Sequence, residues 1–228
     1  MDKKNLILCF SSLRPSQYSE EVLQNREKNY DLSLNWLLKS IPENWDIVYN
    51  DNTIKDISDL RNISLIEGLK NPRIKLNLHN NNEGQINKGA GEHDMCKRGF
   101  SSVNPKDYLW VTYFTARHII PNSWYFDKLD SDWSEYDTVM SNPGFNYLSN
   151  YLKVSSSPGL YNDMLFSMKS NIFSDFINHI DVQLLKDQRK NSETHLFEFI
   201  KDGDFKNLEI QSLGILRNDH QSHGWHLV

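Results

Sequence analysis

The sequence has few cysteines, no low-complexity segment and no long apolar run. Its two cysteines, Cys9 and Cys96, are too few and too far apart for a disulfide framework. The apolar stretch near the N-terminus, Leu6–Phe10, is too short for a signal peptide or a membrane span. We therefore expect a cytoplasmic protein without a transmembrane segment, which would reach a membrane only by peripheral association.

An excess of positive charge is also missing. The chain has 25 Lys and Arg against 30 Asp and Glu, which gives a formal net charge of -5. Without a broad basic surface for a phosphate backbone, nucleic acid is not an expected partner. The 228 residues are 38% hydrophobic and contain no linker between two apolar halves, so we expect a single domain over residues 1–228.

Short apolar runs alternate with amphipathic segments in the first half of the chain. Four of these runs predict buried strands: Leu6–Phe10, a run that begins at Trp45 and stops at the turn-favouring residues Asn50-Asp51-Asn52, Ile74–Leu78, and Tyr108–Phe114. Helices are expected over 19–39, in a short segment before the third strand, and from residue 89 or 90 to 100. This alternation predicts an α/β fold with a mostly parallel central sheet flanked by helices.

The second half is less regular. Further strands are expected within 136–148 and 161–170, and helices over 171–180 and 192–203. A last strand is expected at 209–216, followed by an irregular tail.

Four polar segments each follow one of the first four predicted strands: "SSLRP", "NDNT", "NNNEGQINKGAGE" and "TARH". The carboxyl ends of parallel strands meet at one edge of a sheet, and ligands of α/β proteins bind at that edge. The sequence therefore predicts a ligand site built from these four segments.

The third segment ends in Asn87-Lys88-Gly89-Ala90-Gly91-Glu92, at the junction between a loop and a helix. It matches neither GxxxxGK[ST] nor GxGxxG, which argues against a P-loop and a dinucleotide site. Free backbone N–H groups and Lys88 would suit a phosphate or a sugar hydroxyl. The alternative is a glycine-rich helix start without a functional role.

This layout resembles the nucleotide-sugar glycosyltransferases of the GT-A fold. The resemblance rests on the loop that ends the first strand, Asp51 at the end of the second, "NKG" opening a helix, the strand before "TAR", and the later segments "MLFSMKS" and "SETHLFEFIKDG". "NKGAGE" and "TAR" are similar to segments of small polysaccharide- and lipopolysaccharide-synthesis glycosyltransferases of bacteria and large viruses. The resemblance implies transfer of a sugar from a nucleotide-sugar donor to a glycan or lipid-linked saccharide acceptor. Residues 1–118 would bind the nucleotide and residues 119–228, with their His-rich tail, the acceptor.

The resemblance also implies roles for individual residues. The expected donor-binding residues are Ser11, Ser12, Arg14, Asp51, Asn87, Lys88, Gly89, Arg117, His220 and His223. Glu193 would be the catalytic base of an inverting reaction, with Glu92 and His195 as reserve candidates. An acid in the first turn of a helix is also stabilised by the helix dipole, which is the structural alternative for Glu193. Trp124 and Tyr125 would bind the acceptor sugar.

One departure from the family pattern concerns metal binding. Thr115-Ala116-Arg117 stands where the family has its metal-binding DxD, and an arginine pairs with a diphosphate but does not bind a divalent cation. We therefore expect a reaction independent of Mn²⁺ and Mg²⁺. The remaining candidate metal ligands are Asp130, Asp132 and His220.

Two other functions fit parts of the sequence. A metal-dependent hydrolase could use His220, His223 and His226 together with Asp219 and Asp163. A glycan-binding module without activity, on a glycosyltransferase-like fold, would account for the missing DxD.

Overall fold

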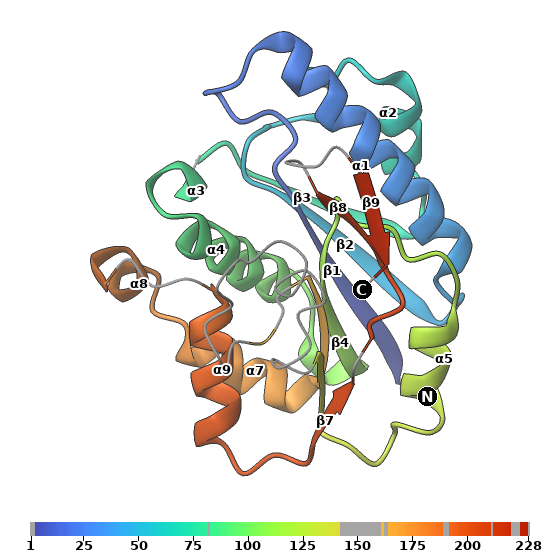
Figure 1. The fold of residues 1–228 in the computed structure, drawn as a ribbon, viewed down its shortest axis with the longest axis vertical. Coiled ribbons are helices and arrows are strands. Elements are labelled where there is room, and N and C mark those ends of the chain that lie inside the picture. The colour runs from blue at the N-terminus through green and yellow to red at the C-terminus, as the bar shows by residue number, and fades with distance from the viewer. Residues whose placement is uncertain are drawn as a thin grey trace.

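A seven-stranded sheet forms the centre of the computed structural model, which describes residues 3–81, 83–141, 161, 164–188, 192–210, 212–219 and 224–227 (Figure 1). The strand order is β3-β2-β1-β4-β6-β5-β7. The strands are β1 (Lys4–Ser11), β2 (Trp45–Asp51), β3 (Ile74–Leu78), β4 (Tyr108–Thr115), β5 (Thr138–Ser141), β6 (Leu165–Lys169) and β7 (Asn207–Ile210). The four strands predicted for the first half are confirmed.

The sheet is mixed but mostly parallel, as predicted. Parallel pairs are β1 with β2, β1 with β4, β2 with β3, and β5 with β7, whereas β6 runs antiparallel to both β4 and β5. The chain builds β1, β2 and β3 outward in one direction and then places β4 on the other side of β1. Strand order therefore reverses between β1 and β4, and such a reversal opens a crevice at the carboxyl edge of a sheet.

Helices cover both faces of the sheet (Figure 1). One face carries α1 (Glu20–Ser40), α2 (Ile63–Leu69) and α5 (Trp124–Asp130), and the other carries α4 (Lys88–Ser101), α7 (Ser170–His179), α8 (Val182–Gln188) and α9 (Ser192–Asp202). Short helical turns lie at α3 (Glu83–Ile86), η1 (Ile57–Asp59) and η2 (Pro105–Asp107). Neither α5 nor α8 was predicted as a separate helix. No helix in the described part of the chain is long and apolar enough to span a membrane.

Burial of β1 on both faces of the sheet explains why its sequence is continuously apolar. Ile7 and Cys9 belong to the core beneath α1, α2 and α5. Leu6, Leu8 and Phe10 belong to the core beneath α4, α7, α8 and α9. A strand that is buried on both faces has no position at which a polar side chain would reach water.

The helix α4 begins at Lys88, one residue earlier than predicted, because the side chain of Asn87 caps it. Asn87 Oδ1 accepts a hydrogen bond of 2.9 Å from the N–H of Ala90. Capping of this kind satisfies one of the N–H groups that have no partner within the helix. It also places Lys88 and Glu92 on the first turns of α4.

The prediction for the C-terminal segment was wrong. Instead of one strand at 209–216 and an irregular tail, β7 ends at Ile210 and the chain turns through Gly214, whose φ is 65°. The strands β8 (Leu216–Asp219) and β9 (Gly224–Leu227) then pair antiparallel, and Leu216 also forms a bridge with Ile119. Glycine tolerates the positive φ, so the turn could have been anticipated, but the pairing partners lie far apart in the sequence.

Candidate functional site

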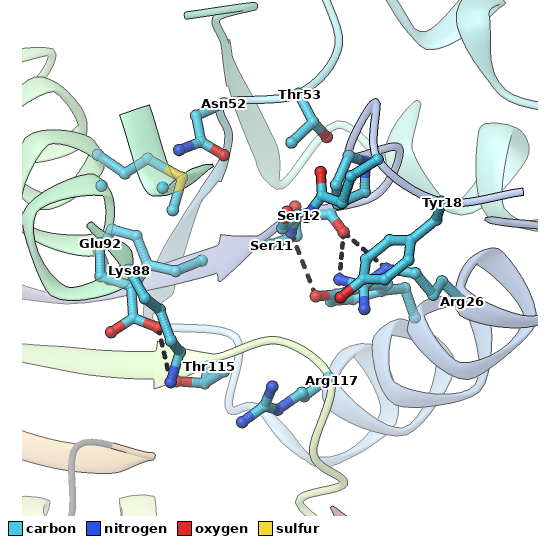
Figure 2. A pocket seen from close by; sticks show the side chains of 17 residues that line it. Ser11, Ser12, Tyr18, Arg26, Asn52, Thr53, Lys88, Glu92, Thr115 and Arg117 are labelled. Atoms are coloured by element: carbon cyan, nitrogen blue, oxygen red, sulfur yellow. Dashed lines mark hydrogen bonds and ion pairs between the residues drawn. The ribbon is translucent and has the colours of Figure 1, made fainter. Parts of the chain in front are cut away.

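The four polar segments converge on one pocket of ≈ 330 Å³ at the carboxyl ends of β1, β2 and β4 (Figure 2). The geometric prediction of a shared edge is therefore confirmed. The residues that line the pocket are Phe10, Ser11, Ser12, Pro15, Gln17, Tyr18, Arg26, Tyr30, Asn52, Thr53, Gly84, Lys88, Gly91, Glu92, Met95, Thr115 and Arg117.

Asp51 holds two of these segments together from beneath the pocket and does not line it. One carboxylate oxygen accepts hydrogen bonds from Ser11 Oγ at 2.6 Å and the N–H of Leu13 at 2.8 Å. The other accepts from the N–H and hydroxyl of Thr53 at 2.7 and 2.6 Å. Burial raises the pKa of Asp51, while the hydrogen bonds from Ser11 and Thr53 act in the opposite direction. The carboxylate predicted to contact a nucleotide is thus occupied by donors of the protein itself.

Arg14, another predicted donor-binding residue, points away from the pocket. Its guanidinium forms ion pairs with Glu20 and with Glu27, which is fully buried. The second oxygen of Glu27 accepts from the N–H groups of Arg61 and Asn62 at 2.8 and 2.7 Å. Arg14 therefore joins the β1–α1 loop to α1 and to the start of α2.

A different arginine, Arg26 of α1, lines the pocket in its place. Its Nε donates to the carbonyl oxygen of Ser12 at 3.1 Å, and its guanidinium carbon lies 5.4 Å from the ring centre of Tyr18 and 5.8 Å from that of Tyr30. Such cation–π contacts and the hydrogen bond to Ser12 together hold the wall of the pocket (Figure 2).

Two cationic side chains lie on the opposite wall from Asn52 and Thr53 (Figure 2). Lys88 reaches it from the first turn of α4, and Arg117 follows the end of β4. Arg117 Nε lies 3.4 Å from Nε2 of the buried His118, which orients the guanidinium. Their charges make this wall suitable for an anionic group.

Glu92 is the carboxylate that lines the pocket. One of its oxygens lies 3.4 Å from Lys88 Nζ, and the other accepts a hydrogen bond of 2.9 Å from Ser192 Oγ at the start of α9. The predicted base, Glu193, stands beside it, with Oε2 3.4 Å from the same hydroxyl. Glu193 is thus linked to the pocket through Ser192 and Glu92 and does not itself line it.

His195, the other reserve candidate for the base, lies in the core. It is 5% exposed, and its ring centre lies 4.9 Å from that of His93, 5.1 Å from that of His179 and 5.7 Å from that of Phe176. It does not line the pocket.

The predicted acceptor residues do not line the pocket either. Tyr125 is buried between Phe126 and Trp133, and its hydroxyl lies 3.0 Å from Ser167 Oγ. Trp124 is 41% exposed and stacks edge-on against Trp133. Both belong to α5, which the sequence did not reveal as a helix, so their alternation between core and surface was missed.

The candidate metal ligands Asp130 and Asp132 are also separate from the pocket. Asp130 accepts from Asn5 at 2.6 Å, at the amino end of β1, whereas the pocket lies at its carboxyl end. Asp132 forms an ion pair with Lys128. Among the described residues, no three His, Cys, Asp or Glu side chains are placed to hold a metal ion.

The tail histidines His220 and His223 lie outside the described residues, as does Asp163. The donor-binding role of these histidines and the metal-dependent hydrolase that the sequence suggested remain predictions. The zinc content of the purified protein, measured by elemental analysis, tests the second of them.

Comparisons with known proteins give a fold and no family. No protein-family profile and no curated protein matches the chain. Among solved structures, the mannosyltransferase PcManGT from Pyrobaculum calidifontis, in complex with GDP-Man and Mn²⁺, matches with a TM-score of 0.58 and 9% identity over 92% of this chain. The match covers 55% of PcManGT, so this chain spans about half of that enzyme's length.

Two further structures are matched over more of their own length. A putative nucleotide-diphospho-sugar transferase from Desulfovibrio desulfuricans has a TM-score of 0.54 and 15% identity, covering 92% of this chain and 80% of its own. The 4-diphosphocytidyl-2C-methyl-D-erythritol synthase from Anaerococcus prevotii has a TM-score of 0.54 and 13% identity, covering 92% of both chains. The chain therefore has the GT-A-like fold of nucleotide-diphospho-sugar transferases, which glycosyltransferases and nucleotidyltransferases share.

Proposed function

We propose that this protein transfers a sugar from a nucleotide-sugar donor to a hydroxyl group of a glycan or lipid-linked saccharide. The observation that carries the proposal is the convergence of Lys88, Arg117 and Glu92 on one pocket at the carboxyl edge of a GT-A-like sheet. In such a transfer, cations would stabilise the departing nucleoside diphosphate, and a carboxylate would accept the proton of the acceptor hydroxyl.

The donor diphosphate would face Lys88 and Arg117. A guanidinium forms two parallel hydrogen bonds to phosphate oxygens, and an ammonium adds a mobile positive charge. These groups would stabilise the negative charge that develops on the leaving nucleoside diphosphate as the bond from the anomeric carbon to the phosphate oxygen breaks.

Glu92 would be the base that accepts the proton of the acceptor hydroxyl while its oxygen attacks the anomeric carbon. Its carboxylate lines the pocket, and Ser192 and Lys88 hold it in place. Glu193, which the resemblance favours, would assist through Ser192. In the single-displacement, inverting reaction that the resemblance implies, Glu92 would thus be the carboxylate next to the substrate.

A divalent cation does not fit the described lining of the pocket. Glu92 is its only carboxylate among the described residues, and Lys88 and Arg117 lie where a cation would be repelled. We therefore propose that these two cationic side chains, and not a metal ion, neutralise the diphosphate.

Thermal shift with UDP-, GDP- and dTDP-linked sugars, each with Mn²⁺ and with EDTA, tests the proposal. A nucleotide sugar that binds the native state raises the melting temperature, and a concentration of 100 times Kd stabilises by about 2.7 kcal/mol. We expect a rise with at least one of them that EDTA leaves unchanged. A melting temperature that no nucleotide or nucleotide sugar shifts would contradict the proposal.

The match to a diphosphocytidyl synthase supports nucleotidyl transfer as a second candidate. The two reactions release different products from nucleotide substrates. A glycosyltransferase releases a nucleoside diphosphate from a nucleotide sugar, and a nucleotidyltransferase releases pyrophosphate from a nucleoside triphosphate. Phosphorus NMR of reaction mixtures distinguishes the two. A third outcome, glycan binding with neither product formed, would favour the non-catalytic glycan-binding module.

A further inference from the structure

A buried histidine lies next to the pocket, where the helices α4, α7 and α9 meet (Figure 1). His93 follows Glu92 on α4 and is 2% exposed, and neither of its ring nitrogens has a hydrogen-bond partner among the residues that the structure describes. A neutral imidazole carries one N–H donor and one acceptor nitrogen, so burying both without partners costs free energy. The helix contact that buries His93 is therefore less stable than one made by apolar side chains alone.

This contact is made by aromatic rings of α9 and α7. The ring centre of His93 lies 4.9 Å from that of His195 on α9 and 5.6 Å from that of Phe176 on α7. The ring centre of His195 in turn lies 5.1 Å from that of His179, the exposed last residue of α7. His195 therefore lies between an exposed imidazole and a buried one.

The charged neighbours of His93 on its own helix are engaged with other groups. Glu92 accepts a hydrogen bond from the first residue of α9, and Asp94 pairs with an arginine of α4. Lys97, one turn further along α4, donates to the carbonyl oxygen of Ile180 at 2.9 Å. None of the described carboxylates forms a hydrogen bond with the His93 ring.

The other helices around the ring do not favour a positive charge either. Next to it α9 places a second imidazole, that of His195, and α7 places a phenyl ring, while α8 adds Leu185 to the same apolar core. Asp175 of α7 is exposed. Burial and the nearby His195 accordingly lower the pKa of His93 from 6.5 to about 3. A proton on this ring is stabilised only when the contact opens and water reaches it.

The same helix contact holds the pocket carboxylate. Ser192, three residues before His195, begins α9 and donates its hydroxyl hydrogen to Glu92, the residue before His93. Separation of α9 from α4 would thus break two interactions at once, the contact between the imidazoles and the hydrogen bond to Glu92.

We propose that the contact between α4 and α9 is a pH-sensitive switch, in which uptake of a proton from water by the pair His93 and His195 detaches α9 and removes Ser192 from Glu92. The effect on catalysis rests on the proposed function, whereas the movement of α9 does not. Below pH 6.5 the open state binds a proton that the closed state excludes, so opening becomes up to about ten-fold more favourable per pH unit.

Hydrogen exchange followed by mass spectrometry at pH 7.5, 6 and 5 tests this inference without any substrate. The proteins are the wild type, His93→Leu, His93→Gln and a control, His79→Gln, which removes an imidazole that lies after β3 and hydrogen-bonds Asn77. After correction for intrinsic exchange rates, we expect wild-type peptides from α9 to lose protection about 30-fold between pH 7.5 and pH 5. Peptides from β1 should keep their protection.

The two variants of His93 separate its charge from its polarity. His93→Leu should keep α9 protected as the pH falls, because leucine binds no proton and needs no hydrogen-bond partner. His93→Gln should make α9 exchange faster at pH 7.5, since its amide is buried in the same place, but should lose most of the pH dependence. His79→Gln should behave like the wild type.

Several results would overturn the switch. An equal loss of protection in α9 and β1 would show unfolding of the whole domain. Protection of α9 that does not change with pH, or that falls equally in the wild type and both His93 variants, would remove the role of this ring. Melting temperatures report whether each variant folds, and either His93 variant alone suffices for the comparison. A failure to bind any nucleotide in thermal shift would contradict the proposed function and leave the exchange result unaffected.

Discussion

The carboxylate of Glu92 and the hydroxyl of Ser192 form a hydrogen bond of 2.9 Å that joins α4 to α9. Glu193 Oε2 lies 3.4 Å from the same hydroxyl. A serine hydroxyl has one proton to donate, so it serves one of the two carboxylates at a time. The acid that lines the pocket and the acid that the sequence favoured as base are therefore coupled through a single side chain.

This coupling predicts different effects of Glu92→Gln and Glu193→Gln. Glu92→Gln should lower the turnover number about 100-fold or more, since it removes the base next to the substrate, and should keep donor affinity within about three-fold. Glu193→Gln, the matched control at the neighbouring carboxylate, should have a smaller effect on turnover. Steady-state kinetics with the donor found by thermal shift measures both. A larger loss for Glu193→Gln would return the role of base to that residue.

Replacing Arg117 should weaken diphosphate binding. Arg117→Ala should raise the Kd of a nucleoside diphosphate roughly 10- to 100-fold, the range for loss of a charge-assisted hydrogen-bond pair. Arg98→Ala is the control, because Arg98 pairs with Asp94 on α4 and does not line the pocket. Calorimetry in EDTA compares the two variants with the wild type. Equal affinities for Arg117→Ala and the wild type would contradict the assignment of the diphosphate to this wall.

Much of the fold was predictable because strand and helix signals are local. The apolar run at Leu6–Phe10 and the strand-favouring residues before "TAR" gave two of the central strands, and their order placed four polar loops at one edge. The antiparallel direction of β6 and the β8–β9 hairpin depend on pairing between distant segments, which local patterns do not encode.

The site was predicted less well, because the direction of a side chain depends on its partners. Arg14 lies in the right loop, but the buried Glu27 attracts it away from the pocket. Arg26 could have been considered as a pocket residue from the sequence. It lies on the predicted helix that follows this loop, one residue before Glu27 and close to Tyr30. Nothing in the sequence favoured Asn52 over the neighbouring Asp51. Only the structure shows that Asn52 lines the pocket and Asp51 does not.

Asp51→Asn should destabilise the protein by about 1–3 kcal/mol. Each oxygen of Asp51 accepts a hydrogen bond from at least one backbone N–H. In the asparagine variant an NH₂ group would replace one of these oxygens, so two donors would face each other at Leu13 or at Thr53. Asp175→Asn is the control, because Asp175 is exposed on α7. Urea unfolding at pH 7 measures both. A free energy of unfolding that Asp51→Asn leaves unchanged would show that these hydrogen bonds contribute no net stability.

Acid should destabilise the protein through His93. The ring is 2% exposed, neither nitrogen has a hydrogen-bond partner among the described residues, and burial together with nearby His195 lowers its pKa from 6.5 to about 3. The unfolded chain then binds more protons than the native state between these values, so stability falls as the pH drops from 6.5 toward 3. The slope from this group reaches about 1.4 kcal/mol per pH unit.

His93→Leu should reduce this dependence, because leucine has a similar volume and no proton to bind. Urea unfolding between pH 4 and pH 7 compares the variant with the wild type. The same slope in both proteins would show that other groups govern the loss of stability in acid.

A crystal soaked with the nucleoside diphosphate that binds best is the most direct test of the proposed diphosphate site at Lys88 and Arg117. We expect density for the diphosphate within hydrogen-bonding distance of Arg117 and Lys88, with no metal ion between the phosphates and Glu92. A nucleotide bound elsewhere on the chain, or a diphosphate held by a metal ion with Arg117 turned away, would contradict it.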